Sequence, residues 1–326
     1  MAAPEVPTTT IGGQPRRQVG VPTVSVIIPS LNAAPYIRAA IDSVLAQSHP
    51  VLEVFVVDGG SEDGTWEIVA GYGEPVKLLD QRKAGRKGIA AGRNLGSEAA
   101  SGEWLAFLDA DDWWDPRKIA EQLAAIAKCP GAALSYTGVC VVSEESGERY
   151  PYTSLSPSAI WPRLRWSNAV GASTVLARRS AMTALGGFRE DLIGFEDWEM
   201  WVRMRLHHSF ACCPEPLSFY RILPHSISHD VQKHLDGIPQ VCRSTMVAGL
   251  TGWKRWVVER RLWAAQLYGA AVIARENGAP RAMSLLLRSL ANWPSPTFLP
   301  IRYKALLSML VRGAPGARRG FEWLTR

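Results

Sequence analysis

The sequence predicts an α/β protein with a mostly parallel sheet, helices on both faces of that sheet and a helical region appended at the C-terminus. Short β-branched runs alternate with segments of helical spacing over the first hundred residues. Polar residues follow three of these runs, and from about residue 235 the pattern is helical. Such alternation is typical of sheets that bind ligands beyond the carboxyl ends of their strands.

The first half of the chain predicts strands and helices in strict alternation. We expect strands at 24–29, 52–57, 76–79 and 104–108, where short apolar runs end at turn residues. We expect helices from Ile37, from Trp66 and over 89–100. Asn32, Asp58 and Asp109 each follow a strand, so three loops that are far apart in the sequence should converge on one crevice.

The second half of the chain is less regular. We expect a helix over 117–128, further strands at 132–142, 174–177 and 217–222, and a polar loop over 143–158. Gly186 and Gly187 interrupt the chain before a helix that begins near Glu196. Beyond residue 235, Trp256 and Trp263 follow helical spacing, and a turn at 277–280 precedes a second helix over 282–290, which predicts a helical hairpin.

The composition is that of a folded protein, with 47% hydrophobic and 20% charged residues in a chain of 326. Residues 1–20 lack apolar periodicity and predict a disordered leader. No apolar stretch after residue 230 is long enough to span a bilayer. The five cysteines show no CxxC spacing, which indicates neither a disulfide framework nor a zinc site and fits a reducing cytoplasm.

Positive charge is concentrated in the C-terminal third of the chain. The net charge is +6, and residues 235–326 contain 14 Lys and Arg against 4 Asp and Glu, together with five tryptophans. No nucleic-acid-binding signature accompanies this charge, so nucleic acid is not the expected partner. An anionic membrane surface or a diphospholipid acceptor would suit it, and plain helix packing with basic residues for solubility is the alternative.

Asp109, Asp111 and Asp112 follow the fourth predicted strand within four positions. On an extended chain Asp109 and Asp111 would share one side, about 7 Å apart, with Ala110 turned away. Two converging carboxylates repel unless a cation or a proton intervenes, and hard oxygen ligands suit Mg²⁺ or Mn²⁺ held jointly with a substrate phosphate. Capping of the next helix is the alternative role for these acids.

Glu196 and Asp197 stand at the start of a predicted helix. A reaction in which a substrate hydroxyl attacks would need a carboxylate that removes the hydroxyl proton, and this pair offers one. Acids also occur at helix starts simply because the helix dipole favours them. Together with the motifs described next, we favour Asp197 as the base and keep Glu196 as its substitute.

Five short motifs follow one another along the chain. They are Val26-Ile27-Ile28-Pro29-Ser30-Leu31-Asn32, Val57-Asp58-Gly59-Gly60-Ser61-Glu62-Asp63-Gly64-Thr65, Gly92-Arg93-Asn94, Phe107-Leu108-Asp109-Ala110-Asp111-Asp112 and Glu196-Asp197-Trp198. Together they resemble the family 2 glycosyltransferases with the GT-A fold over about residues 24–228. Each motif alone is weak, and their order and spacing carry the resemblance.

The resemblance implies a GT-A catalytic domain over 21–234, after the leader at 1–20 and before the basic, Trp-rich helical region at 235–326. It implies inverting transfer of a sugar from a nucleotide-sugar, with a divalent metal on the diphosphate. Asp58 would bind the base, most often uracil, Asp111 would be the principal metal ligand, and Asp109 would face the ribose and diphosphate. The nucleotide-binding positions implied in this way are Pro29, Leu31, Asn32, Asp58, Arg82, Arg93, Asp109, Ala110 and Arg221.

Within the basic stretch from Arg82 to Arg93, a solvated loop is the alternative to nucleotide binding, and Arg93 is our preferred binding residue. Two other positions depart from the family pattern. Gly59 stands where a second acid often follows the position of Asp58, which leaves recognition of the base or ribose open. Leu223 stands where the family often has a histidine, and His225, two places later, is either a third metal ligand or a surface histidine.

Other classes of protein remain as alternatives. A sugar-nucleotidyltransferase would need a glycine-rich phosphate loop after the first strand, and residues 29–32 contain no glycine. A haloacid-type phosphatase places its Asp-x-Asp near the chain start, whereas here Asp109 and Asp111 follow the fourth predicted strand. A non-enzymatic alternative is a catalytically silent sheet domain that serves as a binding module or scaffold.

The preferred function is sugar transfer from a UDP-linked donor to a hydroxyl of a glycan or lipid-linked acceptor, as in polysaccharide biosynthesis. We expect a cytoplasmic enzyme. Contact of the C-terminal helices with the inner face of a membrane, and self-association of the chain, stay open.

Overall fold

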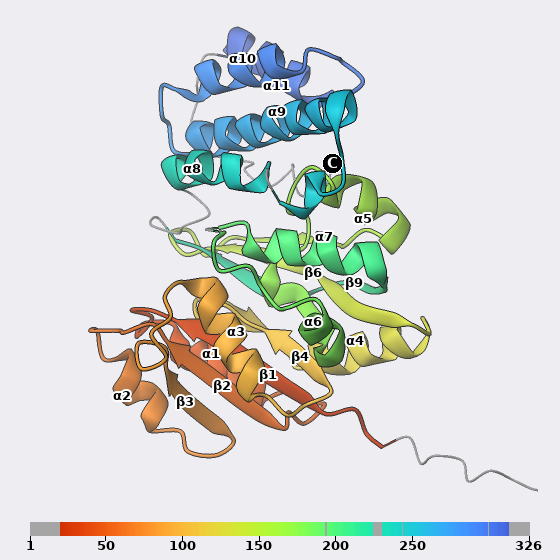
Figure 1. Cartoon of the computed structure of the whole chain (residues 1–326). Coiled ribbons are helices and arrows are strands. Elements are labelled where there is room, and N and C mark those ends of the chain that lie inside the picture. The colour runs from red at the N-terminus through yellow and green to blue at the C-terminus, as the bar shows by residue number, and fades with distance from the viewer. Residues whose placement is uncertain (1–19, 193, 224–229, 243, 299, 313–326) are drawn as a thin grey trace, which may run out of the picture.

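The computed structural model describes residues 20–192, 194–223, 230–242, 244–298 and 300–312. The predicted leader, apart from Gly20, lies outside the described residues, and so do His225 and Trp323. Within the described residues a nine-stranded sheet carries helices on its faces, and a stack of C-terminal helices lies beyond α7 (Figure 1).

The predicted alternation in the first half of the chain is confirmed. It runs β1 (Val24–Ser30), α1 (Ile37–Leu45), β2 (Glu53–Asp58), α2 (Thr65–Ala70), β3 (Val76–Asp80), α3 (Ile89–Ala99) and β4 (Trp104–Phe107). β1 pairs in parallel with β2 and β4, and β2 pairs in parallel with β3. Successive side chains enter two separate cores: Ile27 and Phe107 face one, Val26 and Ala106 the other. The carboxyl ends of β1, β2 and β4 therefore share one edge.

The second half of the chain continues this sheet in mixed orientation. Its elements are β5 (Trp113–Trp114), α4 (Lys118–Ala127), β6 (Ala132–Ser143), β7 (Arg149–Tyr152), α5 (Pro157–Leu164), η1 (Ala172–Thr174), β8 (Val175–Arg178), α6 (Arg179–Ala184), α7 (Glu196–His207) and β9 (Ser209–Ile222). The strand order is β3-β2-β1-β4-β8-β6-β9-β5, with β7 beside β6. β8 runs antiparallel to β4 and β6, whereas β6 and β9 are parallel.

Some local expectations for this half were wrong. The stretch 143–158, expected as a polar loop, contains β7, which pairs with residues 139–142, and Pro157 opens α5 at a position where a missing N–H costs nothing. The two-residue strand β5, too short to show any periodicity, exists because it pairs with β9. β9 itself begins at Ser209, ahead of the expected start at 217, because β6 offers it a partner over its whole length.

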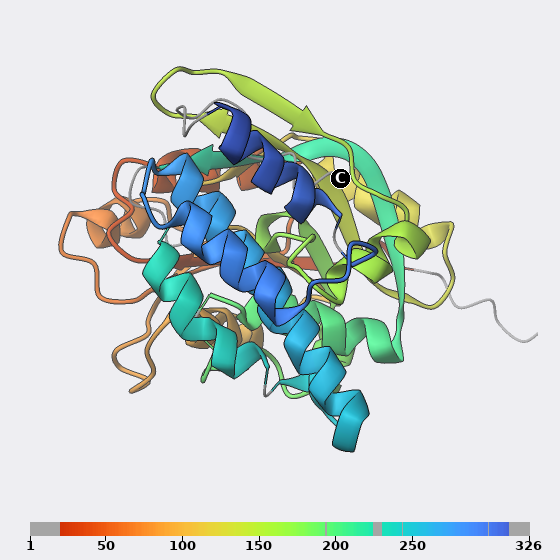
Figure 2. The same cartoon turned by 90° about the horizontal axis from the view of Figure 1, so that it is seen from above.

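The C-terminal region is helical as expected, but the described part holds more than one hairpin. Its helices are α8 (Val231–Val241), η3 (Thr245–Val247), α9 (Gly252–Glu276), α10 (Ala282–Asn292) and α11 (Ile301–Arg312). Figure 2 shows α8 and α10 alongside the long α9. Leu267 and Leu286 belong to the same buried cluster as Phe107 and Trp201, so these helices share a core with one face of the sheet.

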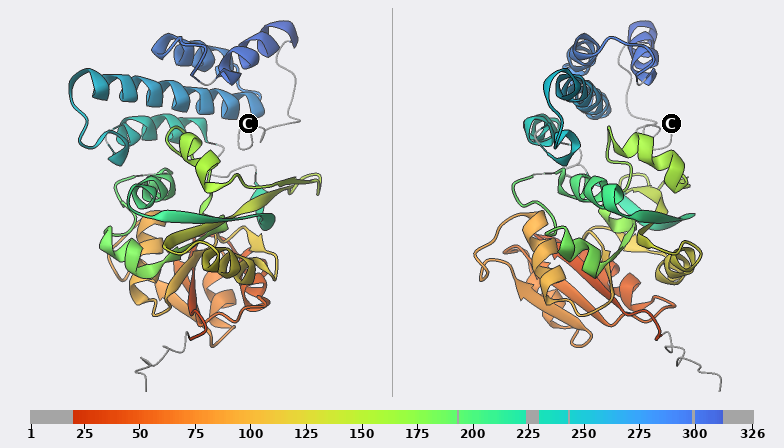
Figure 3. Two further views of the ribbon diagram at one scale, coloured as in Figure 1. Left: turned by 90° about the vertical axis from the view of Figure 1, so that its right-hand side faces the viewer. Right: turned by 45° about the vertical axis from the view of Figure 1, so that its right-hand side comes forward.

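The molecule is therefore layered, with α7, β6 and β9 between the parallel strands and the C-terminal helices (Figure 3). Within the described residues, no helix combines the length and the apolar character that a membrane crossing requires. The five cysteines are all free thiols in the structure.

Candidate functional site

The loops after β1 and β2 are joined to each other at the carboxyl edge of the sheet. Asn32 adopts φ 51°, donates its N–H to Ser61 Oγ (2.8 Å) and accepts the Glu62 N–H at Oδ1 (2.9 Å). Pro29 is buried in β1, whereas Leu31 is 61% exposed. The predicted nucleotide-binding segment is thus held in shape by its neighbouring loop, with one apolar side chain free to meet a ligand.

Asp58 is buried at the end of β2. Its Oδ2 accepts the N–H groups of Gly60 (2.8 Å) and Ser61 (2.9 Å), and Ser61 Oγ donates to Oδ1 (2.5 Å). All three donors belong to residues two and three positions after Asp58, so the Asp58 side chain stabilises the turn that follows it. A carboxylate accepts about four hydrogen bonds, which leaves Asp58 capacity for a donor group of a ligand.

The acidic segment after β4 is a turn, which corrects the expected extended alternation of Asp109 and Asp111. β4 ends at Phe107, and the Asp112 N–H donates to the Asp109 carbonyl oxygen (3.0 Å). Aspartate at the first position of a turn is common because its side chain bonds to nearby amides. Ala110 is buried inside this turn.

Negative charge is concentrated in this acidic turn. Burial, followed by repulsion from Asp109, raises the pKa of Asp111 to about 6. Burial and the charges of Asp111 and Asp109 raise the pKa of Asp112 well above its ordinary value, although Ser173 Oγ donates to its Oδ2 (2.6 Å) and the Arg221 N–H to its Oδ1 (3.0 Å). A cation at this turn would relieve the repulsion.

Asp109 and Asp111 are the carboxylates of the turn that could hold such a cation. Asp109 gives Oδ1 to Arg93, and its side chain is 29% exposed. In the part of the chain that the structure describes, no group of three or more His, Cys, Asp or Glu side chains is arranged to hold a metal ion. Mg²⁺ commonly takes one or two carboxylates and completes its shell with water and substrate phosphates, so the pair fits. His225, the third predicted ligand, lies outside the described residues.

Arg93 on α3 joins the acidic turn to the start of α7. It is 2% exposed; Nη2 donates to Asp109 Oδ1 and Nη1 to Glu196 Oε1, each at 2.7 Å. Burial alone would lower its pKa, but the charges of Asp109, Glu196 and Asp197 raise the pKa of Arg93 above its ordinary value. The residue therefore stays protonated and bridges two acids that are far apart in the sequence.

Glu196 and Asp197 begin α7 in different surroundings. Glu196 is 3% exposed and paired with Arg93. Asp197 is only partly buried; Asn168 Nδ2 donates to its Oδ2 (2.9 Å) and the Trp198 N–H to its Oδ1 (2.7 Å). Burial, followed by the charge of Glu196, raises the pKa of Asp197 to about 7, against the lowering effect of Arg93. A carboxylate that titrates near neutrality suits proton abstraction from a hydroxyl.

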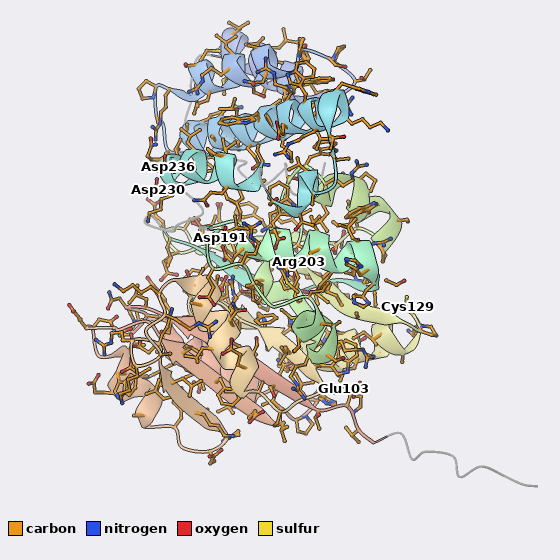
Figure 4. The ribbon with its side chains drawn as sticks, viewed as in Figure 1. Glu103, Cys129, Asp191, Arg203, Asp230 and Asp236 are labelled. Atoms are coloured by element: carbon orange, nitrogen blue, oxygen red, sulfur yellow. The ribbon has the colours of Figure 1, made fainter. Side chains whose placement is uncertain are left out.

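The predicted glycine break before α7 is confirmed. Gly186 and Gly187 have φ of 82° and 70°, and a Cβ on Gly187 would lie 2.7 Å from Asn94 Oδ1. Asn94 holds the turn by accepting the Phe188 N–H (2.8 Å) and donating to the Phe188 carbonyl oxygen (2.8 Å). Arg203 of α7, labelled in Figure 4, donates to the Gly187 carbonyl oxygen (2.7 Å). Helices α3 and α7 therefore clamp the break from both sides.

Arg221 on β9 lies on the other side of the acidic turn. Its Nε donates to the Asp111 carbonyl oxygen (3.0 Å), and its Nη1 pairs with Glu144. The guanidinium lies 5.0 Å from the ring centroid of Tyr36 and 4.7 Å from that of Trp113. This contact places a cation beside the segment that carries Asp111.

Arg82, in contrast, has a side chain that is 60% exposed and pairs with Asp80 (3.4 Å). Arg86, in the same basic stretch, pairs with Glu98 (2.8 Å) and with Glu190. Of the predicted nucleotide-binding arginines, Arg93 and Arg221 thus contact the acidic turn, and Arg82 lies on the surface.

Several residues of the site were missed from the sequence. Ser173 Oγ accepts the Asp109 N–H (3.1 Å) and donates to Asp112, at sequence separations of 64 and 61 residues. Asn168, which binds Asp197, is 29 residues away from it. No local pattern signals such partners. Asp112 stood in the acidic motif, but its burial depends on Ser173 and Arg221.

Comparisons with known proteins identify the family of this chain. The family model described as glycosyl transferase family 2 matches residues 25–182. The putative teichuronic acid biosynthesis glycosyltransferase TuaG of Bacillus subtilis (strain 168) is 31% identical over 219 residues, which cover 65% of this chain and 84% of that protein. The UDP-Glc:alpha-D-GlcNAc-diphosphoundecaprenol beta-1,3-glucosyltransferase WfgD of Escherichia coli is 31% identical over 216 residues, which cover 65% and 82%.

Solved structures share the fold at lower identity. S. aureus TarS 1-349 in complex with UDP-GlcNAc superposes with a TM-score of 0.57 at 16% identity, covering 89% of this chain and 92% of that one. The mannosyltransferase PcManGT from Pyrobaculum calidifontis, in complex with GDP-Man and Mn²⁺, gives a TM-score of 0.59 at 20% identity, covering 94% and 84%. The chain therefore belongs to glycosyl transferase family 2 and is a glycosyltransferase with the GT-A fold.

Proposed function

We propose that this glycosyltransferase is metal-dependent and inverting, and that it transfers a sugar from a UDP-linked donor to a hydroxyl of a glycan or lipid-linked acceptor. The observation that carries the proposal is the buried bridge from Asp109 through Arg93 to Glu196, which links the acidic turn to the helix start bearing Asp197. The bridge thereby connects a turn that would attract a cation with a carboxylate whose pKa is raised to about 7.

The donor would lie along the carboxyl edge of β1, β2 and β4. Asp58, which already accepts the Gly60 N–H, would accept a further hydrogen bond from the base, and residues 29–32 would line the edge beside it. Asp109 and Asp111 are the residues that would hold Mg²⁺ or Mn²⁺, which supplies Lewis-acid neutralisation of the leaving diphosphate. Arg221 adds positive charge beside the acidic turn. A bound cation would lower the pKa of Asp111, which burial and the charge of Asp109 raise.

The acceptor hydroxyl would approach Asp197, which removes its proton as the new glycosidic bond forms. Attack from the side of α7, opposite the leaving group, inverts the anomeric configuration. Glu196 is 3% exposed and gives Oε1 to Arg93, so it is the less suitable base. The relatives support this donor and acceptor chemistry, because the name of WfgD includes UDP-Glc and a diphosphoundecaprenol-linked acceptor.

Titration calorimetry and a donor screen test the proposal together. UDP should bind with Mn²⁺ present, and the affinity should be lost with EDTA and in Asp111→Ala. Turnover of UDP-glucose, UDP-GlcNAc or GDP-mannose, followed by product NMR, should give an inverted anomeric centre. Equal UDP affinity with and without metal would remove metal dependence from the proposal.

The same experiment separates the alternative functions. Nucleotide binding without turnover of any donor would favour a silent binding module. Formation of a nucleotide-sugar from a sugar phosphate and a nucleoside triphosphate would favour a sugar-nucleotidyltransferase. Retention of the anomeric configuration would exclude direct displacement by an acceptor activated at Asp197.

We also propose that the first turns of α9 bring the enzyme to the anionic inner face of a membrane, where a lipid-linked acceptor would reside. Trp253 is 72% and Trp256 is 55% exposed, and Lys254 and Arg255 are exposed beside them. Exposed tryptophans flanked by basic residues suit a lipid interface. Vesicles containing anionic lipid should float the protein, and the double variant Trp253→Ala, Trp256→Ala should not float.

Leu206 on α7, 54% exposed, provides the control for this membrane contact. With anionic vesicles, Leu206→Ala should float like the unchanged protein. With vesicles of neutral lipid, neither of these two proteins should float. Equal flotation of the tryptophan variant and the control would assign the exposed tryptophans to another contact.

A further inference from the structure

Residues 164–168 comprise the last residue of α5 and the four residues that follow it. They contact the first turn of α7 at two points. The Leu164 carbonyl oxygen accepts Trp198 Nε1–H (2.5 Å), and Asn168 Nδ2 donates to Asp197 Oδ2 (2.9 Å). We call residues 164–168 the connector. Since the other oxygen of Asp197 is held by the Trp198 N–H of its own helix, Asn168 is the contact from outside α7 that orients this carboxylate.

The C-terminal helices hold the same connector from its other side. Gln266 of α9 is 4% exposed, and its Nε2 donates to the Trp166 carbonyl oxygen (2.7 Å). The Trp166 ring packs edge-on against Phe298, with ring centroids 5.1 Å apart. Burying an amide side chain is costly unless it is hydrogen-bonded, so this contact ties α9 specifically to the connector.

A second contact runs from Gln266 to the residue that precedes α7. His234 Nε2 lies 3.1 Å from the Gln266 carbonyl oxygen, and the His234 ring lies 5.2 Å from that of Phe195, the N-cap residue of α7. Burial lowers the pKa of His234 to about 4, so the ring is neutral near pH 7 and Nε2–H donates to the carbonyl. Gln266 therefore takes part in two of the contacts that lead from the C-terminal helices toward the first turn of α7.

We propose that Asn168 and Gln266 are positioning residues for Asp197, through which the C-terminal helices set turnover without contacting the nucleotide. The inference rests on the proposed role of Asp197 as the base. A misplacement of about 1 Å can cost about 10²-fold in rate, so loss of one link should lower kcat about 10-fold. The donor edge is built from its own loops, so UDP affinity should not change.

The charged groups that face Asp197 are Glu196 on its own helix and Arg93 from α3. Asn168 is neutral, but its amide favours the ionised carboxylate. A base must be ionised to act, so the rate falls as the pH drops through its pKa. Loss of the Asn168 amide raises the pKa of Asp197, and the acidic limb of the pH–rate profile should move to higher pH.

The experiment uses the full chain with Asn168→Ala, Asn168→Asp and Gln266→Met. Ser289→Ala is the matched control, because Ser289 Oγ donates to the Ala264 carbonyl oxygen (2.6 Å) within the same helices and away from the connector. UDP affinity with Mn²⁺, kcat at saturating donor and the pH profile are measured for each. Asn168→Ala and Gln266→Met should lose about 10-fold in kcat with UDP affinity within about 2-fold, and Ser289→Ala should lose neither.

Asn168→Asp is nearly isosteric and keeps the fold while it places a second carboxylate beside Asp197. Its acidic limb should move further upward than that of Asn168→Ala. The positioning role would be overturned if both Asn168 variants kept a normal kcat and an unshifted acidic limb of the pH–rate profile while Asp197→Asn was inactive. If Gln266→Met weakened UDP affinity by the same factor as it lowered kcat, the claim that the C-terminal helices affect turnover without affecting nucleotide binding would be refuted.

Failure of the underlying function gives a different result. If Asp197→Asn keeps normal turnover, the base is misassigned and the positioning role falls with it. If no link matters for turnover but Asp197→Asn is inactive, the base stands and only the role of the C-terminal helices is refuted.

Discussion

The proposed donor edge and the proposed acceptor side of the site are built in opposite ways. At the donor edge, Asp58 is fixed by Gly60 and Ser61, two and three residues further on. On the acceptor side, Asp197 is fixed by Asn168, 29 residues away, and the connector is fixed by Gln266, 100 residues from Trp166. A carboxylate held by neighbouring residues is visible as a sequence motif, whereas one held by distant residues depends on contacts across the whole chain. Substitutions on one side should therefore leave the function of the other side largely unchanged.

Arg93 is the exception, because it bonds to both sides, and its loss should have the largest effect. Arg93→Met leaves Asp109 and Glu196 without their buried partner, so the free energy of unfolding should fall by about 3–5 kcal/mol. Urea denaturation measures this. Arg189→Met, which removes an exposed pair with Asp191, is the control and should cost at most about 1 kcal/mol. Equal losses in the two variants would mean that the sides are not coupled through Arg93.

Asp197→Asn tests the acceptor side alone. It should lower kcat by about 10²-fold or more and leave UDP affinity unchanged, because a base acts in the transition state. Steady-state kinetics and calorimetry on one preparation give both values. Glu196→Gln should be milder in kcat; an inactive Glu196→Gln beside an active Asp197→Asn would transfer the role of base to Glu196.

The glycine break offers a sharper comparison within the acceptor side. Both glycines have positive φ, which costs an alanine about 1 kcal/mol. Gly186→Ala meets nothing within 4 Å, whereas the Cβ of Gly187→Ala would meet Asn94 Oδ1 at 2.7 Å. We expect losses in the free energy of unfolding of about 1 and about 2 kcal/mol or more, respectively. Thermal unfolding of both variants measures these losses. Equal shifts in Tm for Gly186→Ala and Gly187→Ala would show that the Asn94 side chain moves away from the new Cβ at little energetic cost.

Asp58→Asn tests the donor edge, and its expected effect is smaller than those of Arg93→Met, Asp197→Asn and Gly187→Ala. The amide keeps one oxygen for the turn but loses the charge and one acceptor, so UDP affinity should weaken by about 10-fold, which is about 1.4 kcal/mol. Calorimetry measures the affinity, and kcat at saturating donor should be little changed. A loss of kcat with normal affinity would place Asp58 outside the nucleotide site.

The same contrast explains how much could be predicted from the sequence. The parallel strands β1, β2 and β4 are short apolar runs, and Asp58 ends β2 while Asn32 and Asp109 follow two residues after β1 and β4, so the proposed donor edge follows from local pattern. The turn at Asp109 to Asp112 had a local signal, since aspartate often opens a turn, and the extended interpretation overlooked it. The strand β5 has two residues and owes its existence to β9, which no window of sequence reveals.

The acceptor side could be predicted only in part. The break at Gly186 and Gly187 and the acids of α7 were recognisable, because glycine pairs and first-turn acids have positional meaning. The partners Asn168 and Gln266 were not, because a buried amide looks like any surface amide until its carbonyl or carboxylate partner is known.

The hydrogen bond from Gln266 to the Trp166 carbonyl oxygen has a consequence for synthesis of the chain on the ribosome. Structure forms from the N-terminus as the chain emerges, so the loops of β1, β2 and β4 are available before α9 has been translated. An unfinished chain can then assemble the donor edge while its connector still lacks the clamp from α9. We expect chains that end before α9 to turn over the donor at least about 10-fold more slowly than the completed chain, because they lack the Gln266 contact.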